Sequence, residues 1–313
     1  MDKKYVFGPV LSKRLGYSLG IDLVPLKACT YDCIYCQLGK TTDKRIKRFS
    51  CGSLYKIFDQ LDVKLKSSPR IDYITFSGSG EPTLNLNIGF IINEIKKITG
   101  IPVAVLTNGS LLFNEDVQHD LSNADLIIPS LDAVNESQFE LINRPHHDLT
   151  YNEMVEGLFK IRKWFKKKIY LEIMFVKDLN DKIEYIPNYK EIIGKIDPDL
   201  VHINTVSRPP SENYAKPSDP QRLKYLSSQI FKDCSIVHDT QVPQNLENYD
   251  QWRDCITSAL SKRPLTITDM EKMTGMERAE IIKLLYLLER KGIIQSREYS
   301  ENTFYYSNTS INP

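Results

Sequence analysis

Three cysteines that could bind a metal, Cys29, Cys33 and Cys36, lie within a stretch of eight residues. Thiolates on one short loop can converge on a single metal centre, because each is a good ligand for zinc or iron. A structural zinc site has four protein ligands, and no histidine or cysteine close in the sequence offers an obvious fourth. An iron–sulfur cubane held by three cysteines would instead keep its fourth iron open for a small molecule.

A second stretch with the residue types of a binding site is Gly-Ser-Gly-Glu-Pro-Thr at 78–83. Gly78, Ser79 and Gly80 are small enough for the backbone to approach a bound molecule closely. Glu81 adds a carboxylate directly after a predicted strand. Such a turn could also be a plain tight turn, but its position one strand after the cysteine loop favours a binding site.

The run Cys-Thr-Tyr-Asp-Cys-Ile-Tyr-Cys at 29–36 resembles the signature loop of the radical S-adenosylmethionine (SAM) superfamily, with the aromatic Tyr35 before the last cysteine. The resemblance implies a [4Fe-4S] cluster whose open iron is chelated by the amino and carboxylate groups of SAM. An electron from the cluster would cleave SAM to methionine and a 5′-deoxyadenosyl radical that abstracts hydrogen from a substrate. The stretch 78–81 is similar to the superfamily's glycine-glycine-glutamate motif, which contacts the SAM amino group, with Ser79 replacing a glycine.

Polar residues also follow the later predicted strands, where members of the superfamily hydrogen-bond the carboxylate, ribose or adenine of SAM. We expect Ser130 and Asn108 to act in this way before Glu172, because a carboxylate inside a strand is as often a paired core residue. The predicted cofactor-binding residues are Tyr35, Gly78, Ser79, Gly80, Glu81, Asn108, Ser130, Asp132 and Asn204, and the predicted metal ligands are Cys29, Cys33 and Cys36. No catalytic side chain is assigned.

From residue 21 to residue 206 the chain repeats a short β-branched apolar run followed by a segment of helical period, which is typical of a parallel sheet covered by crossover helices. The expected strands are Gly20–Pro25, Tyr73–Ser77, Pro102–Thr107, Leu126–Leu131, Ile169–Val176 and Leu200–Val206. The expected helices are Leu54–Leu65, Ile88–Ile98, Asn114–Leu121, Tyr151–Lys167 and Ile186–Ile196. Six strands are too few for a closed barrel of eight. The predicted fold class is therefore α/β, a partial (β/α)6 barrel of the radical SAM type.

The C-terminal part has a different pattern. It predicts helices at Gln251–Ser261, Thr268–Thr274 and Glu277–Lys291, then strands at Ile293–Tyr299 and Thr303–Ser307. Three helices and a hairpin are the outline of a winged helix. We therefore expect a barrel domain at 1–221, a connecting segment at 222–250 and a small winged-helix-like domain at 251–313.

The chain of 313 residues carries 41 Lys and Arg against 40 Asp and Glu, so no global field attracts polyanions. No apolar stretch is long enough to span a membrane, and Met1–Val10 lacks the apolar core of a signal peptide. The sequence predicts a cytoplasmic protein. Cys51, Cys234 and Cys255 are far apart, which favours ordinary buried thiols over a second cluster.

The C-terminal region is close to neutral, with nine basic and nine acidic residues between Asp250 and Tyr306. Its presumed recognition helix opens with Glu277 and Glu280, which suits the phosphates of a DNA major groove poorly. We expect this region to contact protein, peptide or structured RNA in preference to DNA, or to pack on the barrel.

The segments 7–23, 25–29 and 35–42 resemble the branch of the superfamily grouped with wyosine-type tRNA base-synthesis enzymes. The resemblance implies a reductant such as flavodoxin or ferredoxin as partner, and a tRNA base or a peptide as candidate substrate. Basic residues from Lys40 to Arg48 could flank the site and take a phosphate, or could form a solvated loop. A rival hypothesis is a zinc-binding winged-helix protein that regulates or binds peptide or RNA without radical chemistry.

Overall fold

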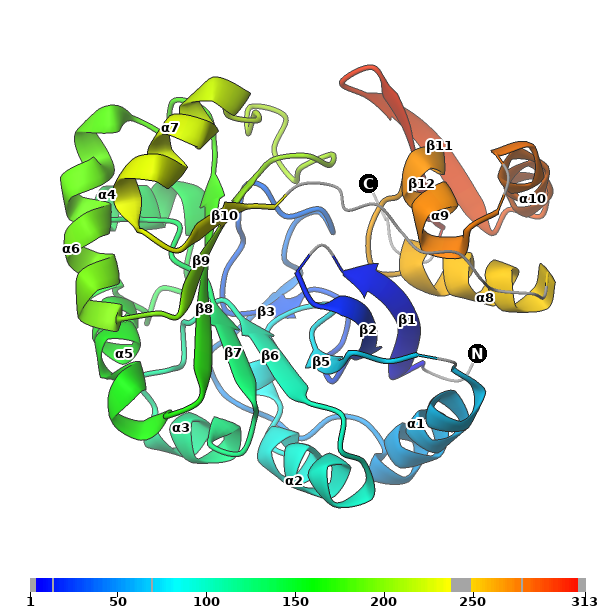
Figure 1. Cartoon of the computed structure of the whole chain (residues 1–313), viewed down its shortest axis with the longest axis horizontal. Helices are drawn as coiled ribbons and strands as arrows, with labels where there is room; N and C mark the ends of the chain where they lie inside the picture. The colour runs from blue at the N-terminus through cyan, green and yellow to red at the C-terminus, as the bar shows by residue number, and fades with distance from the viewer. Residues whose placement is uncertain (1–3, 13, 69, 238–248, 277, 309–313) are drawn as a thin grey trace.

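The computed structural model describes residues 4–12, 14–68, 70–237, 249–276 and 278–308. An eight-stranded sheet curves through the centre of the molecule, and helices cover its outer face (Figure 1). Residues 238–248 of the expected connecting segment and 309–313 of the expected last domain lie outside the described residues. No described helix is both long and apolar enough to cross a lipid bilayer.

The strands of the sheet follow the order β1-β2-β5-β6-β7-β8-β9-β10. Their bounds are β1 (Val6–Ser12), β2 (Gly16–Ile21), β5 (Tyr73–Phe76), β6 (Val103–Thr107), β7 (Leu126–Pro129), β8 (Lys168–Phe175), β9 (Leu200–Thr205) and β10 (Cys234–Ile236). Strand β1 is antiparallel to β2, and all other neighbours are parallel. In the described part of the chain β1 and β10 are the two edges, so the barrel is open, as the six predicted parallel strands indicated.

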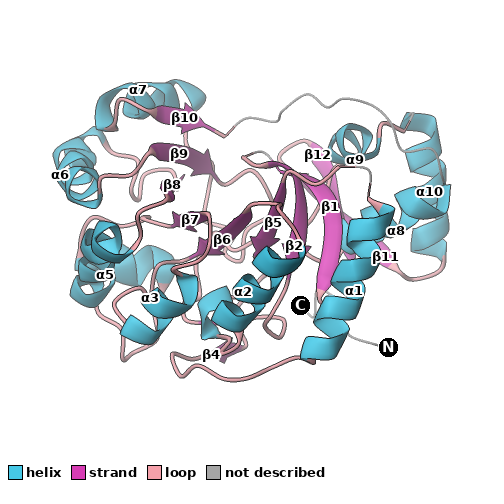
Figure 2. Cartoon of the chain, turned by 60° about the horizontal axis from the view of Figure 1, so that its bottom comes forward, coloured by secondary structure: helices cyan, strands magenta, loops and turns pink. Residues whose placement is uncertain are grey.

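The helices that cross between parallel strands are α1 (Leu54–Ser67), α2 (Ile88–Ile98), α3 (Glu115–Leu121), α5 (Tyr151–Trp164), α6 (Ile186–Ile196) and α7 (Pro220–Ile230). The shorter elements are β3 (Ala28–Cys29), β4 (Asp43–Lys44), η1 (Pro82–Leu84), α4 (Glu136–Gln138), the π-helical turn η2 (Phe139–Asn143) and η3 (Ile183–Tyr185). The five predicted crossover helices correspond to α1, α2, α3, α5 and α6. Figure 2 shows these helices packed along one side of the sheet.

Strand β8 shows how the sequence separates the core from the interior of the barrel. Ile169, Leu171 and Ile173 pack with the large core under the helices. Glu172 and Met174, which alternate with them, line the interior cavity. Successive side chains of a strand point to opposite faces, so this period of two places the polar groups of the strands inside the barrel.

Two edge elements extend the predicted sheet. The predicted first strand Gly20–Pro25 overlaps only the end of β2, and β1 was not predicted. Gly8 and Pro9 in β1 are typical of a turn, and an edge strand tolerates them because one of its sides has no ladder to maintain. After Gln221, where the barrel domain was expected to end, β10 pairs with β9 and continues the same sheet.

The C-terminal region consists of α8 (Tyr249–Leu260), α9 (Ile267–Thr274), α10 (Arg278–Arg290) and the hairpin of β11 (Ile294–Tyr299) and β12 (Asn302–Ser307). We call residues 249–308 the C-terminal module. The module has its own core, against which Val10 of β1 packs. Arg208, in the loop after β9, donates a hydrogen bond from Nε to the backbone oxygen of Pro264 (2.9 Å). The three helices and the hairpin follow the predicted order, and their likeness to a winged helix stays a prediction.

Histidine 202 on β9 predicts a pH dependence of stability. Burial lowers the pKa of His202 from 6.5 to about 4, with Arg14 adding to the effect and Glu172 opposing it. A histidine whose pKa is lowered by folding binds fewer protons in the folded state than in the unfolded state. The free energy of unfolding therefore falls as the pH drops from about 6.5 to about 4. In His202→Phe the fall between pH 6.5 and 4 should be smaller, by up to about 3 kcal/mol in urea unfolding.

The matched control is His147→Gln, because the His147 side chain is 82% exposed. The control should keep the pH dependence of the wild-type protein. An unchanged pH dependence in His202→Phe would show that His202 does not cause the loss of stability at low pH.

Candidate active site

The three clustered cysteines lie on the loop that follows β2, and amide or ammonium groups point at each sulfur. Lys27 Nζ donates to Cys36 Sγ at 3.1 Å. The side-chain amides of Asn108 and Asn143 donate to Cys29 and Cys33, each at 3.6 Å. Donors of this kind stabilise negative charge on sulfur, which suits thiolate ligands of a metal centre.

The surroundings of these thiols disfavour ionisation unless a cation is bound. Burial, together with the neighbouring Glu81 carboxylate, raises the pKa of Cys29 to about 12. Burial and the nearby Asp132 carboxylate also raise the pKa of Cys33 well above its usual value. A coordinated metal would supply the positive charge that holds these groups as thiolates.

The spacing of the sulfurs distinguishes a cluster from a single ion. Among the described residues, only His146, His147 and Asp148 place three ligand atoms within 4.8 Å of one another. At least one pair of the three cysteine sulfurs is therefore more than 4.8 Å apart, whereas Zn–S bonds of about 2.3 Å bring two ligands of one ion within about 4.6 Å. A cluster that offers each thiolate its own iron spans a wider gap. The donor set thus fits an iron–sulfur cluster better than a zinc ion.

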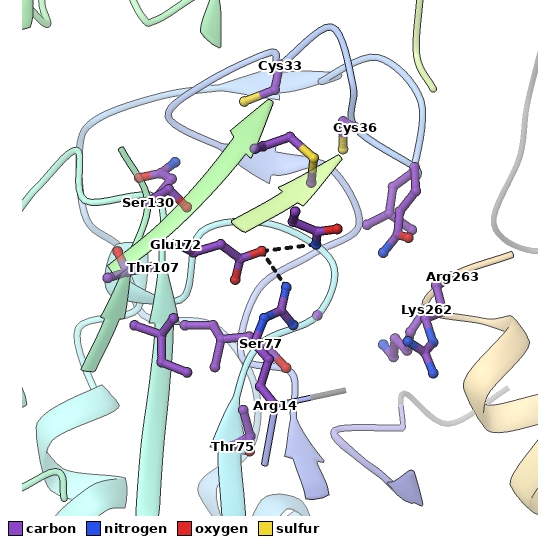
Figure 3. Close-up of a pocket in the computed structure, with 18 of the residues that line it drawn as sticks. Arg14, Cys33, Cys36, Thr75, Ser77, Thr107, Ser130, Glu172, Lys262 and Arg263 are labelled. Carbon is purple, nitrogen blue, oxygen red and sulfur yellow. Dashed lines mark hydrogen bonds and ion pairs between the residues drawn. The ribbon is translucent and has the colours of Figure 1, made fainter. Parts of the chain in front are cut away.

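One cavity of about 420 Å³ joins the cysteine loop to the C-terminal strand ends and to the C-terminal module (Figure 3). Every predicted site residue except Ser79 lines it, namely Cys29, Cys33, Tyr35, Cys36, Gly78, Gly80, Glu81, Asn108, Ser130, Asp132 and Asn204. The carboxyl ends of parallel strands meet at one edge of the sheet, which explains why residues so distant in sequence converge. The structure therefore brings the predicted set together.

Glu81 ties the glycine stretch to the neighbouring strand. Its buried carboxylate accepts hydrogen bonds from Thr83 Oγ1 (2.6 Å), Thr107 Oγ1 (2.7 Å) and the Asn108 backbone N–H (2.8 Å). Burial raises the pKa of Glu81, and these hydrogen bonds oppose the shift. The carboxylate therefore fixes the loop after β5 against the end of β6, so much of its hydrogen-bonding capacity is used within the protein.

Asp132, just beyond β7, organises a second polar group beside the cysteines. It accepts hydrogen bonds from the Tyr35 hydroxyl, from Asn143 Nδ2 (2.9 Å) and from the Met174 backbone N–H (3.0 Å). Burial raises the pKa of Asp132 to about 6, against the lowering effect of these hydrogen bonds. Tyr35 and Asp132 were both predicted from the sequence, but their direct contact was not.

Inside the barrel, Arg14 forms an ion pair with Glu172, and Asn204 Nδ2 donates to the same carboxylate at 3.4 Å (Figure 3). All three residues line the cavity. A carboxylate inside a strand was expected to be ion-paired as often as to bind a ligand. Glu172 is ion-paired, and it also faces the cavity. Arg14 was not among the predicted site residues. Its position just before β2 is the one feature of the sequence that could have indicated it.

The C-terminal module contributes Ala259, Lys262 and Arg263 to the cavity wall. Packing on the barrel was one of the alternatives expected for this region, but these three residues were not predicted to reach the site. The basic loop after the cysteines does not line the cavity. Its Arg48 is half-buried and structural, since it pairs with Asp120 and donates to the Thr83 backbone oxygen (2.9 Å).

The remaining cysteines lie on separate elements. Cys51 precedes α1 and donates to the Leu23 backbone oxygen. Cys234 is in β10 and Cys255 is in α8, and burial raises the pKa of both thiols. None of them lines the cavity, and all three are only partly buried, so the expected full burial is not found.

The model of the Radical SAM superfamily matches residues 23–186, which are 164 of the 313 residues. The chain belongs to this superfamily and is a radical SAM enzyme, and membership implies a [4Fe-4S] cluster and SAM as cofactors. Over 96% of its length, the chain is 39% identical to a UPF0026 protein of Methanocaldococcus jannaschii, of which the match covers 95%. Within the superfamily the chain therefore belongs with the UPF0026 proteins.

Two further comparisons add detail. Over 236 residues the chain is 44% identical to a protein named GTPase Obg of Brachyspira hyodysenteriae, and it spans only 35% of that longer protein. A radical SAM methyltransferase from Sphaerobacter thermophilus has a similar fold, with a TM-score of 0.53 at 13% identity over 70% of this chain and 65% of that one. At this identity the likeness concerns the fold, an α/β partial barrel with a mostly parallel sheet.

The close approach of Gly80 to the cysteine strand predicts a position-specific defect. A Cβ on Gly80 would stand 1.8 Å from the Ala28 backbone oxygen, directly before Cys29. Gly80→Ala must therefore push the loop after β5 away from the cysteine loop. We expect the anaerobically reconstituted variant to lose at least about half of its iron. Gly100→Ala is the control, because a Cβ there meets no atom within 4 Å. Equal iron content in both variants would contradict the expected packing.

Proposed function

We propose that Cys29, Cys33 and Cys36 hold a [4Fe-4S] cluster in this chain and that SAM binds in the same cavity. The supporting observation is that one cavity is lined by the three cysteines, by Gly78, Gly80 and Glu81, and by the polar ends of three strands. The bound cofactors supply the 5′-deoxyadenosyl radical that abstracts hydrogen from a substrate. The protein itself positions these groups and excludes water from them.

Each part of the cavity has a proposed task. The backbone of the stretch 78–81 takes the amino group of SAM, held in place by the hydrogen bonds of Glu81. Asn108 and Ser130 lie at the ends of β6 and β7, where they can reach the carboxylate or ribose. Asp132 ties Tyr35, and with it the cysteine loop, to the end of β7 through a direct hydrogen bond.

We further propose an anionic substrate, with a tRNA base in its nucleotide as the leading candidate. The proposal rests on the wyosine-type resemblance and on four cationic side chains in the cavity wall, Arg14, Arg208, Lys262 and Arg263, two of which, Arg14 and Lys262, also pair with acids of the barrel. In our proposal the C-terminal module is a winged helix that contacts structured RNA or protein. Flavodoxin or ferredoxin would supply the electron in the cytoplasm.

Replacing one cysteine tests the cofactor assignment. Anaerobically reconstituted wild-type protein should contain about four irons per chain and cleave SAM on reduction. Cys33→Ala should lose most of the iron and all detectable SAM cleavage, because one of only three thiolate ligands is gone. Cys255→Ala, which removes a thiol outside the cavity, should retain both properties. A Cys33→Ala protein with full iron and full cleavage would refute the proposed cluster site.

The tRNA proposal is tested in cells that lack this protein. Mass spectrometry of digested tRNA should then show the loss of one modified nucleoside or the accumulation of its precursor. Re-expression of the wild-type chain should restore the profile, whereas Cys33→Ala should not. An unchanged profile would exclude tRNA as the substrate without affecting the cofactor assignment.

A further inference from the structure

The serine that departs from the superfamily's glycine motif has a specific bonding partner. Ser79 Oγ donates to Asp22 Oδ2 at 2.5 Å, and the Ser79 backbone N–H donates to Asp22 Oδ1 at 3.2 Å. Asp22 directly follows β2 and is only 1% exposed. The hydroxyl that a glycine would lack therefore fastens the glycine stretch to a buried carboxylate.

The C-terminal module reaches the same carboxylate. Lys262 Nζ forms an ion pair with Asp22 Oδ2 and lies 3.4 Å from Ser79 Oγ. The Lys262 side chain is 15% exposed, and its ammonium lies 5.4 Å from the centre of the Phe7 ring. Figure 3 shows Lys262 and Arg263 reaching toward the cavity from the module. The contact joins residues that are 240 positions apart in the sequence.

The stretch 78–81 has little room to move between Asp22 and the cysteine loop. A Cβ on Gly78 would stand 2.6 Å from Asp22 Cγ. On the other side, the Lys27 N–H donates to the Ser79 backbone oxygen (2.7 Å), and the Glu81 N–H donates to the Ala28 backbone oxygen (3.1 Å). A displacement of Asp22 is therefore transmitted to the loop beside Cys29.

Charge explains why Lys262 matters to this arrangement. A carboxylate taken out of water needs a counter-charge or enough donors, and a buried pair that loses one member leaves the other uncompensated. Among the described ion pairs, Lys262 is the cation that meets Asp22. Without it, Asp22 would turn toward water or rearrange, and the Ser79 contacts would change with it.

We propose that Lys262 is a positioning residue that acts through Asp22 and Ser79 to hold the stretch 78–81 in its SAM-binding conformation. The C-terminal module thereby completes the SAM site of the barrel. This inference rests on the proposed function, because it assigns the stretch 78–81 to SAM.

The test uses full-length, cluster-loaded protein with Lys262→Met, which keeps the length of the side chain and removes its charge. The dissociation constant for SAM should rise at least about tenfold, while the iron content stays at the wild-type level. Hydrogen–deuterium exchange of the peptide containing residues 78–81, measured without SAM, should become faster. Lys262→Arg should restore both properties. Lys291→Met, a change of an exposed lysine in the same module, should alter neither.

A double variant that changes both members of the Asp22–Lys262 ion pair provides a second test. Asp22→Asn combined with Lys262→Met removes both buried charges, so it folds even if the single variant does not. Its SAM affinity should be reduced about as much as that of Lys262→Met alone or of Asp22→Asn alone. The reason is that both substitutions disrupt the same contact between Lys262, Asp22 and Ser79. Wild-type affinity and wild-type exchange in Lys262→Met, or in the double variant if the single one fails to fold, would overturn the inference. Failure of the wild-type protein to bind SAM would instead refute the proposed function.

Discussion

The site depends on the close packing of two loops at the C-terminal edge of the sheet. Gly80 lies against the Ala28 backbone oxygen with no space for a side chain, and the Glu81 N–H donates to that same oxygen at 3.1 Å. The first loop carries the cysteines, and the second carries the groups proposed for SAM. A parallel sheet places both loops at one edge. Their mutual hydrogen bonds then fix the distance between the cysteines and the backbone proposed to bind SAM, which the proposed reaction requires.

Acids that are buried or half-buried perform most of the positioning in this cavity. Glu81, Asp132, Asp22 and Glu172 are each held by hydrogen bonds or by a cation from another element. Such groups are costly to bury and therefore demand specific partners. The pairs consequently connect β2, β5, β6, β7, β8, β9 and the C-terminal module to one another. The same interactions that neutralise the acids also determine where the strand ends lie relative to the cysteine loop.

Sequence reasoning recovers the features that are local in the chain. The spacing of Cys29, Cys33 and Cys36 and the glycines around Ser79 are readable because the chemistry lies within a few residues. The parallel strands are readable from apolar runs, because both faces of such a sheet are covered. Strand β1 escapes detection because Gly8 and Pro9 are typical of a turn, and only its edge position permits them.

The charges of the C-terminal module show why the remaining contacts cannot be predicted from sequence. Counted alone, the module is nearly neutral, which argues against DNA but says nothing about which of its cations is already paired. Lys262 pairs with an acid of the barrel, not of the module. Arg208 of the barrel, in turn, donates to the Pro264 backbone oxygen of the module at 2.9 Å. Net charge is a property of a segment, whereas these interactions belong to the interface between two segments. The balance of charge in the module therefore reflects its attachment to the barrel as much as any external partner.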